Sequence, residues 1–267
     1  MNTAPLAGVD FAESGSGPAV LFVPGSYSTP AAWRPMHKLL PPRWRLVSTS
    51  LCGYGGTAET RSRDDHGMQH EVRVVEAVAR AVGGPVHLVG HSFGGTVALA
   101  AALSGRFEVK SLALFEANPL DLLQRHGHAA LHQAARVMSR GFEQVVGQGE
   151  RDAPGRIIDY WGGEGVFAAM PASVQDYCRQ TVGANVLDWH TCFGFEAAGP
   201  DLARLDLPVL LVRGGLANAA MVAITELLAA HLREVRHEVV DGAGHFLVTS
   251  HAAECAGLLA AHLGRAA

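Results

Sequence analysis

Neither sign of charge dominates this sequence, and charged residues of both kinds are scarce. Lys and Arg together number 21 and Asp and Glu 25, which leaves a formal net charge of −4, and charged residues make up only 17% of the chain. Nucleic-acid-binding proteins usually carry a strongly basic balance, and this chain has none. No acidic tail points to a charged partner either. The composition therefore predicts no nucleic-acid partner.

Cysteine is also scarce. The chain has four cysteines, Cys52, Cys178, Cys192 and Cys255, and no two are spaced as C-x-x-C, which argues against a zinc site or a thioredoxin-like site. Scattered thiols in a chain of 267 residues fit a reducing compartment. Residues 1–6 lack the positive and apolar regions of a signal peptide. We therefore expect a cytoplasmic protein.

One long stretch, residues 81–105, has no Asp, Glu, Lys or Arg and is long enough to cross a membrane. Gly83-Gly84-Pro85 and Gly94-Gly95 interrupt it, and polar residues lie between these breaks. We therefore interpret the stretch as a buried strand, a tight turn and a buried helix, and we expect no membrane span.

What the sequence does contain is an alternation of two kinds of apolar segment. The short, β-branched runs have the length of strands, and most are apolar throughout, as expected of strands covered on both faces. The longer segments between them have helical character. This alternation predicts an α/β protein with a mostly parallel central sheet and helices on both faces. The predicted strands are 19–23, 46–50, 86–89, 109–115, 208–212 and 235–240, and the predicted helices are 30–40, 69–82, 93–104, 218–231 and 251–263.

Residues 119–200 interrupt this alternation. The segment has helix-like pieces at 120–146, 154–160 and 171–181, concentrates aromatic residues, and contains no clear buried strand. We interpret it as a helical cap inserted between two strands, over the edge of the sheet where open α/β sheets bind ligands. Residues 1–118 and 201–267 are then expected to form the core domain.

The strongest local pattern is Gly90-His91-Ser92-Phe93-Gly94, which matches G-x-S-x-G between a predicted strand and a predicted helix. In that context the serine lies on a sharp turn that exposes its hydroxyl as a nucleophile. A serine hydroxyl is a weak nucleophile, so it needs a base to take its proton. We predict that Ser92 is the nucleophile and that the neighbouring His91 points elsewhere and fills space.

His245 is the candidate base. It ends the loop Asp241-Gly242-Ala243-Gly244-His245, directly after the last predicted strand. Neutral imidazole can take a proton and return it near neutral pH. The oxyanion that forms when serine attacks a carbonyl needs backbone N–H donors. We expect these oxyanion-hole donors to be the amides of Phe93, which follows the nucleophile, and of Ser26, in the loop after the first long strand.

Together these segments resemble the α/β-hydrolase fold family. The matching pieces span nearly the whole chain in the family's order: Val23-Pro24-Gly25-Ser26 with Trp33 downstream, Gly53-Tyr54-Gly55, the Gly-His-Ser-Phe-Gly-Gly turn, and Gly242-Ala243-Gly244-His245. The resemblance implies an α/β-hydrolase fold with a helical cap at 119–200 and a Ser-His-acid triad. The chain departs from the family at Pro24, where His is frequent, and at Ser50, where Asp is frequent.

The acid of the triad is the largest departure. Many family members place an Asp shortly after the strand that follows the cap, but residues 213–225 contain no carboxylate, and Asn218 there carries no charge. A minority of similar hydrolases place the acid one strand earlier, where Glu116 stands at the tip of an apolar strand. An acid there can hold the histidine tautomer and stabilise the imidazolium. We predict that Glu116 is the acid, with Asp121 and Asp188 as weaker alternatives.

Three histidines in the cap, His126, His128 and His132, invite a reading as a metal cluster. No H-E-x-x-H motif or carboxylate set accompanies them. We expect them to lie on a solvated helix, and we expect neither a metal nor a cofactor.

The sequence therefore predicts a serine hydrolase, similar to a carboxylesterase, that cleaves an ester or related acyl bond of a small, apolar substrate through an acyl-serine intermediate. The aromatic residues of the cap favour an apolar pocket. Two alternatives stay open. The same Ser-His pair could serve a lyase, an acyltransferase or a perhydrolase, because a fold does not define a function. The missing late Asp would also fit a non-catalytic ligand-binding protein. The natural substrate and the oligomeric state, including a homo-oligomer, are not determined by the sequence.

Overall fold

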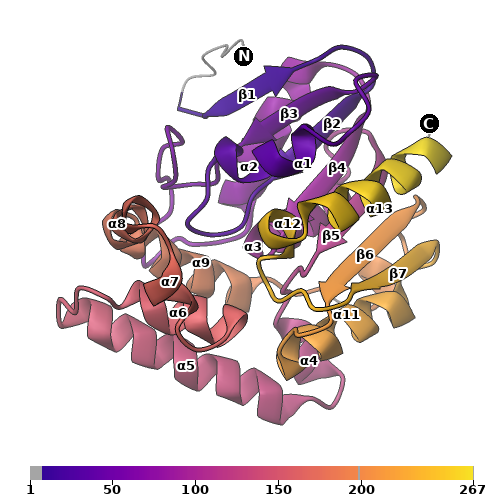
Figure 1. Ribbon diagram of the computed structural model, residues 1–267. Coiled ribbons are helices and arrows are strands. Elements are labelled where there is room, and N and C mark those ends of the chain that lie inside the picture. The colour runs from indigo at the N-terminus through magenta and orange to yellow at the C-terminus, as the bar shows by residue number, and fades with distance from the viewer. Residues whose placement is uncertain (1–7, 198, 267) are drawn as a thin grey trace.

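The computed structural model describes residues 8–197 and 199–266, so the expectation about residues 1–6 lies outside the described chain. A seven-stranded sheet has the order β1-β3-β2-β4-β5-β6-β7 (Figure 1). Every neighbouring pair is parallel except β1 with β3, which confirms the mostly parallel α/β sheet. The strands are β1 (Phe11–Ser14), β2 (Ala19–Val23), β3 (Arg45–Thr49), β4 (Val86–His91), β5 (Val109–Phe115), β6 (Val209–Gly214) and β7 (Val235–Val240).

All six predicted strands are present, and β1 is the strand that the sequence pattern did not predict. It has four residues, lies at the edge of the sheet, and buries only Phe11 fully. A short edge strand with one buried side chain has no apolar run to reveal it, and its pairing with β3 defines it instead.

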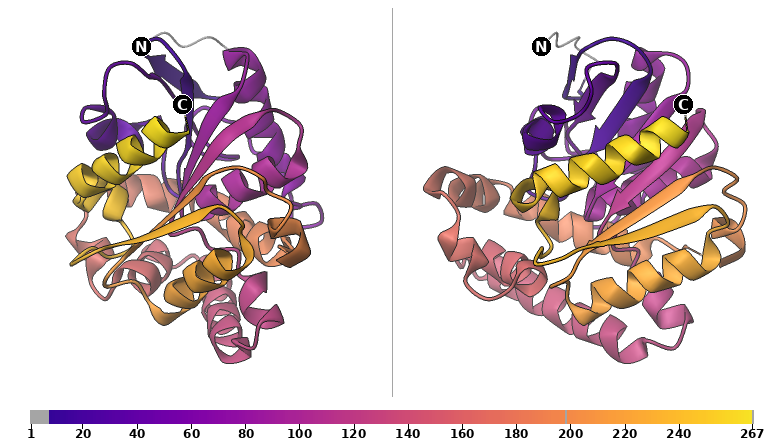
Figure 2. Two further views of the ribbon diagram at one scale, coloured as in Figure 1. Left: turned by 90° about the vertical axis from the view of Figure 1, so that its right-hand side faces the viewer. Right: turned by 45° about the vertical axis from the view of Figure 1, so that its right-hand side comes forward.

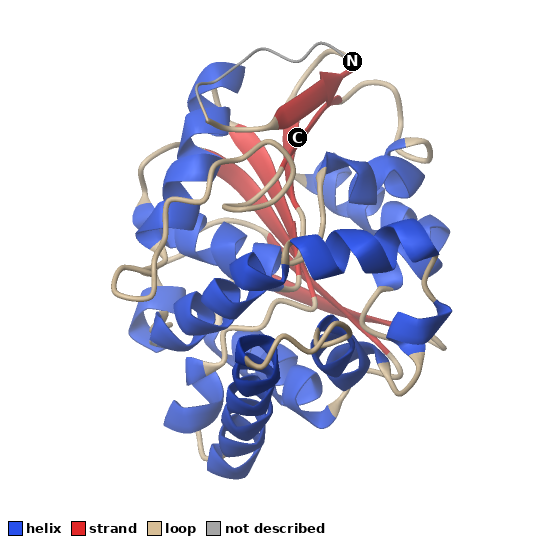
Figure 3. Ribbon diagram, turned by 90° about the vertical axis from the view of Figure 1, so that its left-hand side faces the viewer, coloured by secondary structure: helices blue, strands red, loops and turns tan. Residues whose placement is uncertain are grey.

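Helices cover both faces of the twisted sheet, as Figures 2 and 3 show. Along β2, Leu21 and Val23 belong to the core on one face, whereas Val20 and Phe22 belong to the core on the other. This alternation explains why β2 is apolar throughout. The first face packs against α2 (Gln69–Val82), α3 (Phe93–Ser104) and α11 (Ala219–His231), and the second against η1 (Pro30–Trp33), α1 (Arg34–His37), α12 (Leu247–Ser250) and α13 (Ala252–Arg265).

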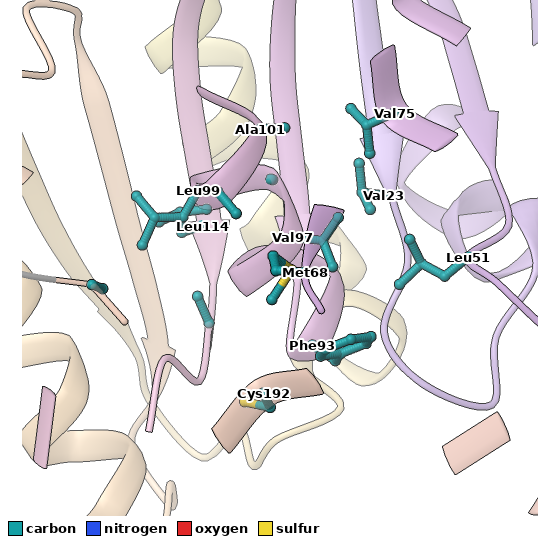
Figure 4. Close-up of a cluster of buried hydrophobic side chains, with 14 of the residues drawn as sticks. Val23, Leu51, Met68, Val75, Phe93, Val97, Leu99, Ala101, Leu114 and Cys192 are labelled. Atoms are coloured by element: carbon teal, nitrogen blue, oxygen red, sulfur yellow. The ribbon is translucent and has the colours of Figure 1, made fainter. Parts of the chain in front are cut away.

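The elements around α3 illustrate the first of these cores. Figure 4 shows Phe93 and Val97 of α3 among side chains from β2, α2 and the loop after β3. Helix α3 is buried on nearly every side, with ten of its residues buried. The uncharged stretch 81–105 thus forms β4 and α3, as predicted. Among the residues that the structure describes, no helix has the length and apolar character needed to cross a membrane.

The helices between β5 and β6 lie at the carboxyl end of the parallel strands, at the bottom of Figure 1. The predicted helix 120–146 is in fact two helices, because Gly127 takes a positive φ of 85° and breaks the chain between them. The sequence pattern also missed α9, whose residues have weak helix propensity and which depends on packing. The helices of this segment are α4 (Asp121–Arg125), α5 (Ala129–Gly147), α6 (Pro154–Gly162), α7 (Val166–Ala169), α8 (Ala172–Gln180), α9 (Val182–Gly194) and α10 (Gly199–Leu202).

The turn between β4 and α3 is packed so closely that its glycines have no room for side chains. A Cβ on Gly94 would lie 2.1 Å from the carbonyl oxygen of Pro24, and one on Gly95 would lie 2.8 Å from the Cβ of Ala117. The turn is therefore wedged between the segment that follows β2 and the segment that follows β5.

We expect Gly94→Ala to destabilise the protein by about 3 kcal/mol or more, because the added methyl group meets rigid backbone. Gly141→Ala is the matched control. Gly141 lies within α5, and an added Cβ would meet no atom within 4 Å beyond the neighbouring backbone of its own helix, so this change should stabilise the protein by about 0.5–1 kcal/mol through helix propensity. Urea denaturation of both variants measures the difference. Equal unfolding midpoints would show that the turn tolerates a side chain.

Candidate active site

Ser92 occupies the sharp turn that the sequence motif predicts. It lies between β4 and α3 with φ 54° and ψ −128°, a conformation that costs a non-glycine residue energy. Its N–H donates to the carbonyl of Phe115 at 2.9 Å, which ties the turn to the end of β5. The residue is 7% exposed. The strained turn and its close packing hold the hydroxyl at the carboxyl edge of the sheet.

His245 and Glu116 meet Ser92 at this edge. His245 Nε2 lies 2.9 Å from Ser92 Oγ, and His245 Nδ1 lies 2.6 Å from Glu116 Oε2. All three side chains are buried. They come from the ends of β4 and β5 and from the loop after β7. Along the chain, His245 lies 129 residues after Glu116 and 153 residues after Ser92.

The hydrogen bonds around Glu116 decide the protonation of this group. Burial works to raise the pKa of Glu116, but the hydrogen bonds from His245 and from the N–H of Gly214, at 2.7 Å, outweigh it and lower the pKa below its ordinary value. Glu116 is therefore a carboxylate near neutral pH. Because a carboxylate only accepts, the His245 ring proton lies on Nδ1, and Nε2 is left to accept the Ser92 proton.

His91 differs from its predicted role, because it points toward His245. Its Nε2 donates to the backbone carbonyl of His245 at 2.8 Å, and its ring centroid lies 5.1 Å from that of His245. Burial lowers the pKa of His91 to about 3, so its ring is neutral. Trp161 of α6 also stacks on the His245 ring, with ring centroids 5.5 Å apart. The backbone and the ring of His245 are therefore both restrained by neighbours.

The two residues expected to supply oxyanion donors both border the same cavity as Ser92. Phe93 is the first residue of α3, where backbone N–H groups have no helical partner. Ser26 lies in the loop after β2, and a Cβ on the adjacent Gly25 would stand 3.0 Å from Ser92 Cβ. Ser26 Oγ also donates to Asp188 Oδ2 at 2.5 Å. The structure thus places both residues at the cavity beside Ser92.

The other acids considered from the sequence do not reach His245. Asp188 lines the cavity, but its oxygens accept from Ser26, from Tyr54 at 2.7 Å and from Arg61 at 2.8 Å. Asp121 forms an ion pair with Arg125 on α4. Asn218 caps α11 by accepting from the N–H of Met221 and donates to the carbonyl of Tyr160.

The cavity beside Ser92 is walled by helices α6 and α9. Its apolar lining includes Ile157, Ile158, Trp161, Trp189 and Phe246. Its polar lining away from the Ser-His pair comes from the Ser26–Ser28 loop, from α9, from His91 and from Asn118. The predicted apolar pocket is therefore present, with a polar margin on one side.

Behind this margin lies a buried charge cluster that the sequence analysis missed. Arg61 pairs with Glu59, with Glu71 at 2.9 Å and with Asp188 at 2.8 Å, and the Arg61 and Glu71 side chains are fully buried. Burial raises the pKa of Glu71 to about 7 against the pull of Arg61, and burial likewise raises the pKa of Asp188. The cluster joins the loop after β3, α2 and α9.

The histidines singled out in the helical segment do not gather around one point. His126 packs against His231, with ring centroids 4.4 Å apart, and His132 is buried against Phe193. The expectation of a solvated position is wrong for His132, because α9 packs over it. Within the described residues, no group of three His, Cys, Asp or Glu side chains is placed to hold a metal ion.

The four cysteines are free and buried.

Asn185, Asp188, Trp189 and Cys192 also escaped the sequence analysis as cavity residues. Their spacing of i, i+3, i+4 and i+7 places them on one face of a helix, and all four line the cavity. That spacing was the available signal, but it becomes informative only once α9 is known to be a helix.

A family model described as the alpha/beta hydrolase family matches residues 20–258, so the chain belongs to that family. Membership supports the assignment of this chain as a hydrolase. The fold and the order of the motifs agree with this assignment, and the resemblance seen in the sequence is confirmed.

Similar proteins carry several activities in their names. A fluoroacetate dehalogenase from Burkholderia sp is 24% identical over 262 residues, covering 88% of this chain and 83% of that protein. An alpha/beta hydrolase from Sphaerobacter thermophilus DSM 20745 has a TM-score of 0.72 at 20% identity, covering 97% of this chain and 100% of that one. A thermophilic esterase from Thermogutta terrifontis has a TM-score of 0.72 at 21% identity, covering 99% and 97%. These structural likenesses show the fold.

Replacing Arg61 should leave two buried carboxylates without a counter-charge. We expect Arg61→Leu to lower the free energy of unfolding at pH 8 by about 3–5 kcal/mol. Glu71 and Asp188 have raised pKa values in the folded state, so they are most easily accommodated when protonated, and stability falls as the pH rises through those values. The loss should therefore be smaller at pH 5 than at pH 8.

Denaturation at both pH values measures this effect. Arg80→Leu is the control, because Arg80 pairs with Glu76 while 71% exposed, and removal of an exposed partner should cost about 1 kcal/mol or less at either pH. A loss for Arg61→Leu that matched the control, or that grew toward pH 5, would contradict the buried-cluster interpretation.

Proposed function

We propose that this protein is a serine hydrolase that cleaves an ester or related acyl bond of a small, mostly apolar substrate, with residues 119–200 as a cap over the site. The observation that carries the proposal is the chain of two hydrogen bonds from Ser92 Oγ to His245 at 2.9 Å and from His245 to Glu116 at 2.6 Å. This is the geometry that activates a serine hydroxyl. The apolar cavity beside it accounts for the substrate class.

In the proposed reaction, Ser92 Oγ attacks the substrate carbonyl carbon while its proton passes to His245 Nε2. The carbonyl oxygen becomes an oxyanion, which the amides of Phe93 and Ser26 stabilise. Glu116 stabilises the imidazolium. When the tetrahedral intermediate collapses, the bond to the leaving alkoxide breaks and the alkoxide takes the proton from Nε2. Water then loses a proton to His245, attacks the acyl-serine carbonyl, and releases the acid and Ser92 in the same way.

Two features favour acyl chemistry over the dehalogenation named for the Burkholderia relative. Displacement of a halide from carbon by Ser92 would leave an ether on the serine, and water does not hydrolyse an ether under these conditions, whereas it hydrolyses an acyl ester. A haloacetate is also an anion. Among the described residues that line the cavity, none is Lys or Arg, so a substrate carboxylate would find no counter-charge there.

We expect a fluorophosphonate probe to label Ser92 and a panel of p-nitrophenyl esters to be hydrolysed. Ser92→Ala should abolish labelling and lower kcat by up to about a millionfold, with the fold intact by circular dichroism. The exposed Ser250 supplies the control, since Ser250→Ala should retain both the labelling and the turnover of the unaltered protein. Product analysis by mass spectrometry identifies the acyl acceptor. Residual turnover above a few per cent in Ser92→Ala would exclude Ser92 as the nucleophile, and transfer to another acceptor in place of water would favour an acyltransferase.

The acid is tested by comparing Glu116→Gln with Asn218→Ala. The Gln side chain has nearly the same shape but no charge to stabilise the imidazolium, and its amide can favour the wrong tautomer. The comparable change in a serine protease costs about ten-thousandfold, and we expect at least roughly a hundredfold loss in kcat. Asn218→Ala removes a helix cap and a hydrogen bond to the Tyr160 carbonyl, neither of which touches His245, and it should cost about tenfold or less. A folded Glu116→Gln within threefold of wild type would place the acid elsewhere.

A further inference from the structure

The cavity beside Ser92 contains polar atoms for which the proposed acyl chemistry has no use. Asn185 is 1% exposed and lines the cavity, yet its Oδ1 has no hydrogen-bond partner among the described residues. The hydroxyl of Tyr27, which also lines the cavity, is buried and likewise lacks a partner within the described chain. Buried polar groups in proteins are nearly always hydrogen-bonded, so each unsatisfied group requires an explanation.

The orientation of the Asn185 amide follows from its neighbour. Asn185 Nδ2 lies 3.4 Å from Asp188 Oδ2. The pairs that Asp188 forms with Arg61, Tyr54 and Ser26 hold it as an acceptor. An acceptor cannot face the amide oxygen without repulsion, so Nδ2 faces Asp188 and Oδ1 faces away from it. Asn185 therefore offers an acceptor, and it is held in place by the buried charge cluster behind it.

The charges around this part of the cavity favour a neutral donor as its ligand. Arg61 is shared among three carboxylates, so the cluster carries excess negative charge and repels an anion. Much of the rest of the lining is aliphatic and aromatic, so a cation bound there would lose its hydration without compensating contacts, which disfavours its binding. A hydroxyl group suits either orphan atom, because it can donate to Asn185 Oδ1 or accept from the Tyr27 hydroxyl.

We propose that Asn185 and Tyr27 form a subsite that binds a hydroxyl group of the substrate, so that the preferred substrate is an ester of a hydroxylated acyl chain. The inference rests on the proposed serine hydrolase function and names its substrate class. Asn185 and Tyr27 are specificity-determining residues that contribute nothing to the attack by Ser92. The rest of the chain lies against the apolar wall formed by Ile158 and Trp189.

The test compares p-nitrophenyl hexanoate with its 2-, 3- and 6-hydroxy derivatives, because the hydroxyl position that reaches the subsite is itself to be found. At least one hydroxy ester should have a kcat/KM about tenfold or more above that of hexanoate. Asn185→Leu keeps the side-chain size and removes the acceptor, and Tyr27→Phe removes only a hydroxyl. Each should reduce about tenfold the preference for that ester, measured as the ratio of its kcat/KM to that of plain hexanoate.

Ile158→Val is the matched control, since it alters the apolar wall without touching a polar atom. It should change the kcat/KM of both esters by the same factor and leave their ratio unchanged. If hexanoate is hydrolysed but the kcat/KM of every hydroxy ester lies within threefold of that of hexanoate, the subsite is overturned and the proposed function is not. A ratio that neither Asn185→Leu nor Tyr27→Phe alters overturns the subsite as well. Failure to hydrolyse any ester, with no fluorophosphonate labelling of Ser92, overturns the proposed function and the subsite together.

Discussion

The close packing of the β4–α3 turn is the constraint on which the candidate site depends. Gly94 lies against the backbone that follows β2, Gly95 lies against the backbone that follows β5, and the Ser92 N–H is bonded to the last residue of β5. Three chain segments thereby meet in close contact at the turn. The proposed nucleophile, one proposed oxyanion donor and the proposed acid each come from one of these segments, so their spacing is a property of the backbone.

Glu116 is held in place by the backbone at the end of β6. Gly214 has no side chain, and a Cβ there would lie 2.2 Å from the carbonyl oxygen of Ala243. The loop leading to His245 therefore packs directly on the backbone of β6. The N–H of Gly214 is free to bind Glu116 Oε1, and Glu116 itself takes a positive φ of 47° that directs the chain away from β5. The Glu116 carboxylate thus binds the β6 backbone with one oxygen and His245 with the other.

The buried cluster around Arg61 connects the helical segment to the rest of the protein. Asp188 belongs to α9, Glu71 to α2 and Arg61 to the loop between β3 and α2, so the ion pairs cross between the segment and the sheet's covering helices. A buried ion pair contributes little net stability because desolvation offsets attraction, but it penalises any arrangement that separates the charges. We infer that the cluster fixes the position of α9, and with it the cavity wall and the loop that holds Ser26.

The sequence alone determined the alternation of strands and helices, the parallel sheet, the turn that bears Ser92 and the family, because these depend on local periodicity and on glycines at close approaches. It also named Glu116, His245, Ser26 and Phe93, which the structure brings to one edge of the sheet. It did not determine α9, the break at Gly127 or the partners of His91, Asn185 and Asp188. Those features depend on contacts between residues far apart in the chain, where weak local propensity is overridden by packing and by the need to pair buried charges. Only the tertiary structure decides such contacts.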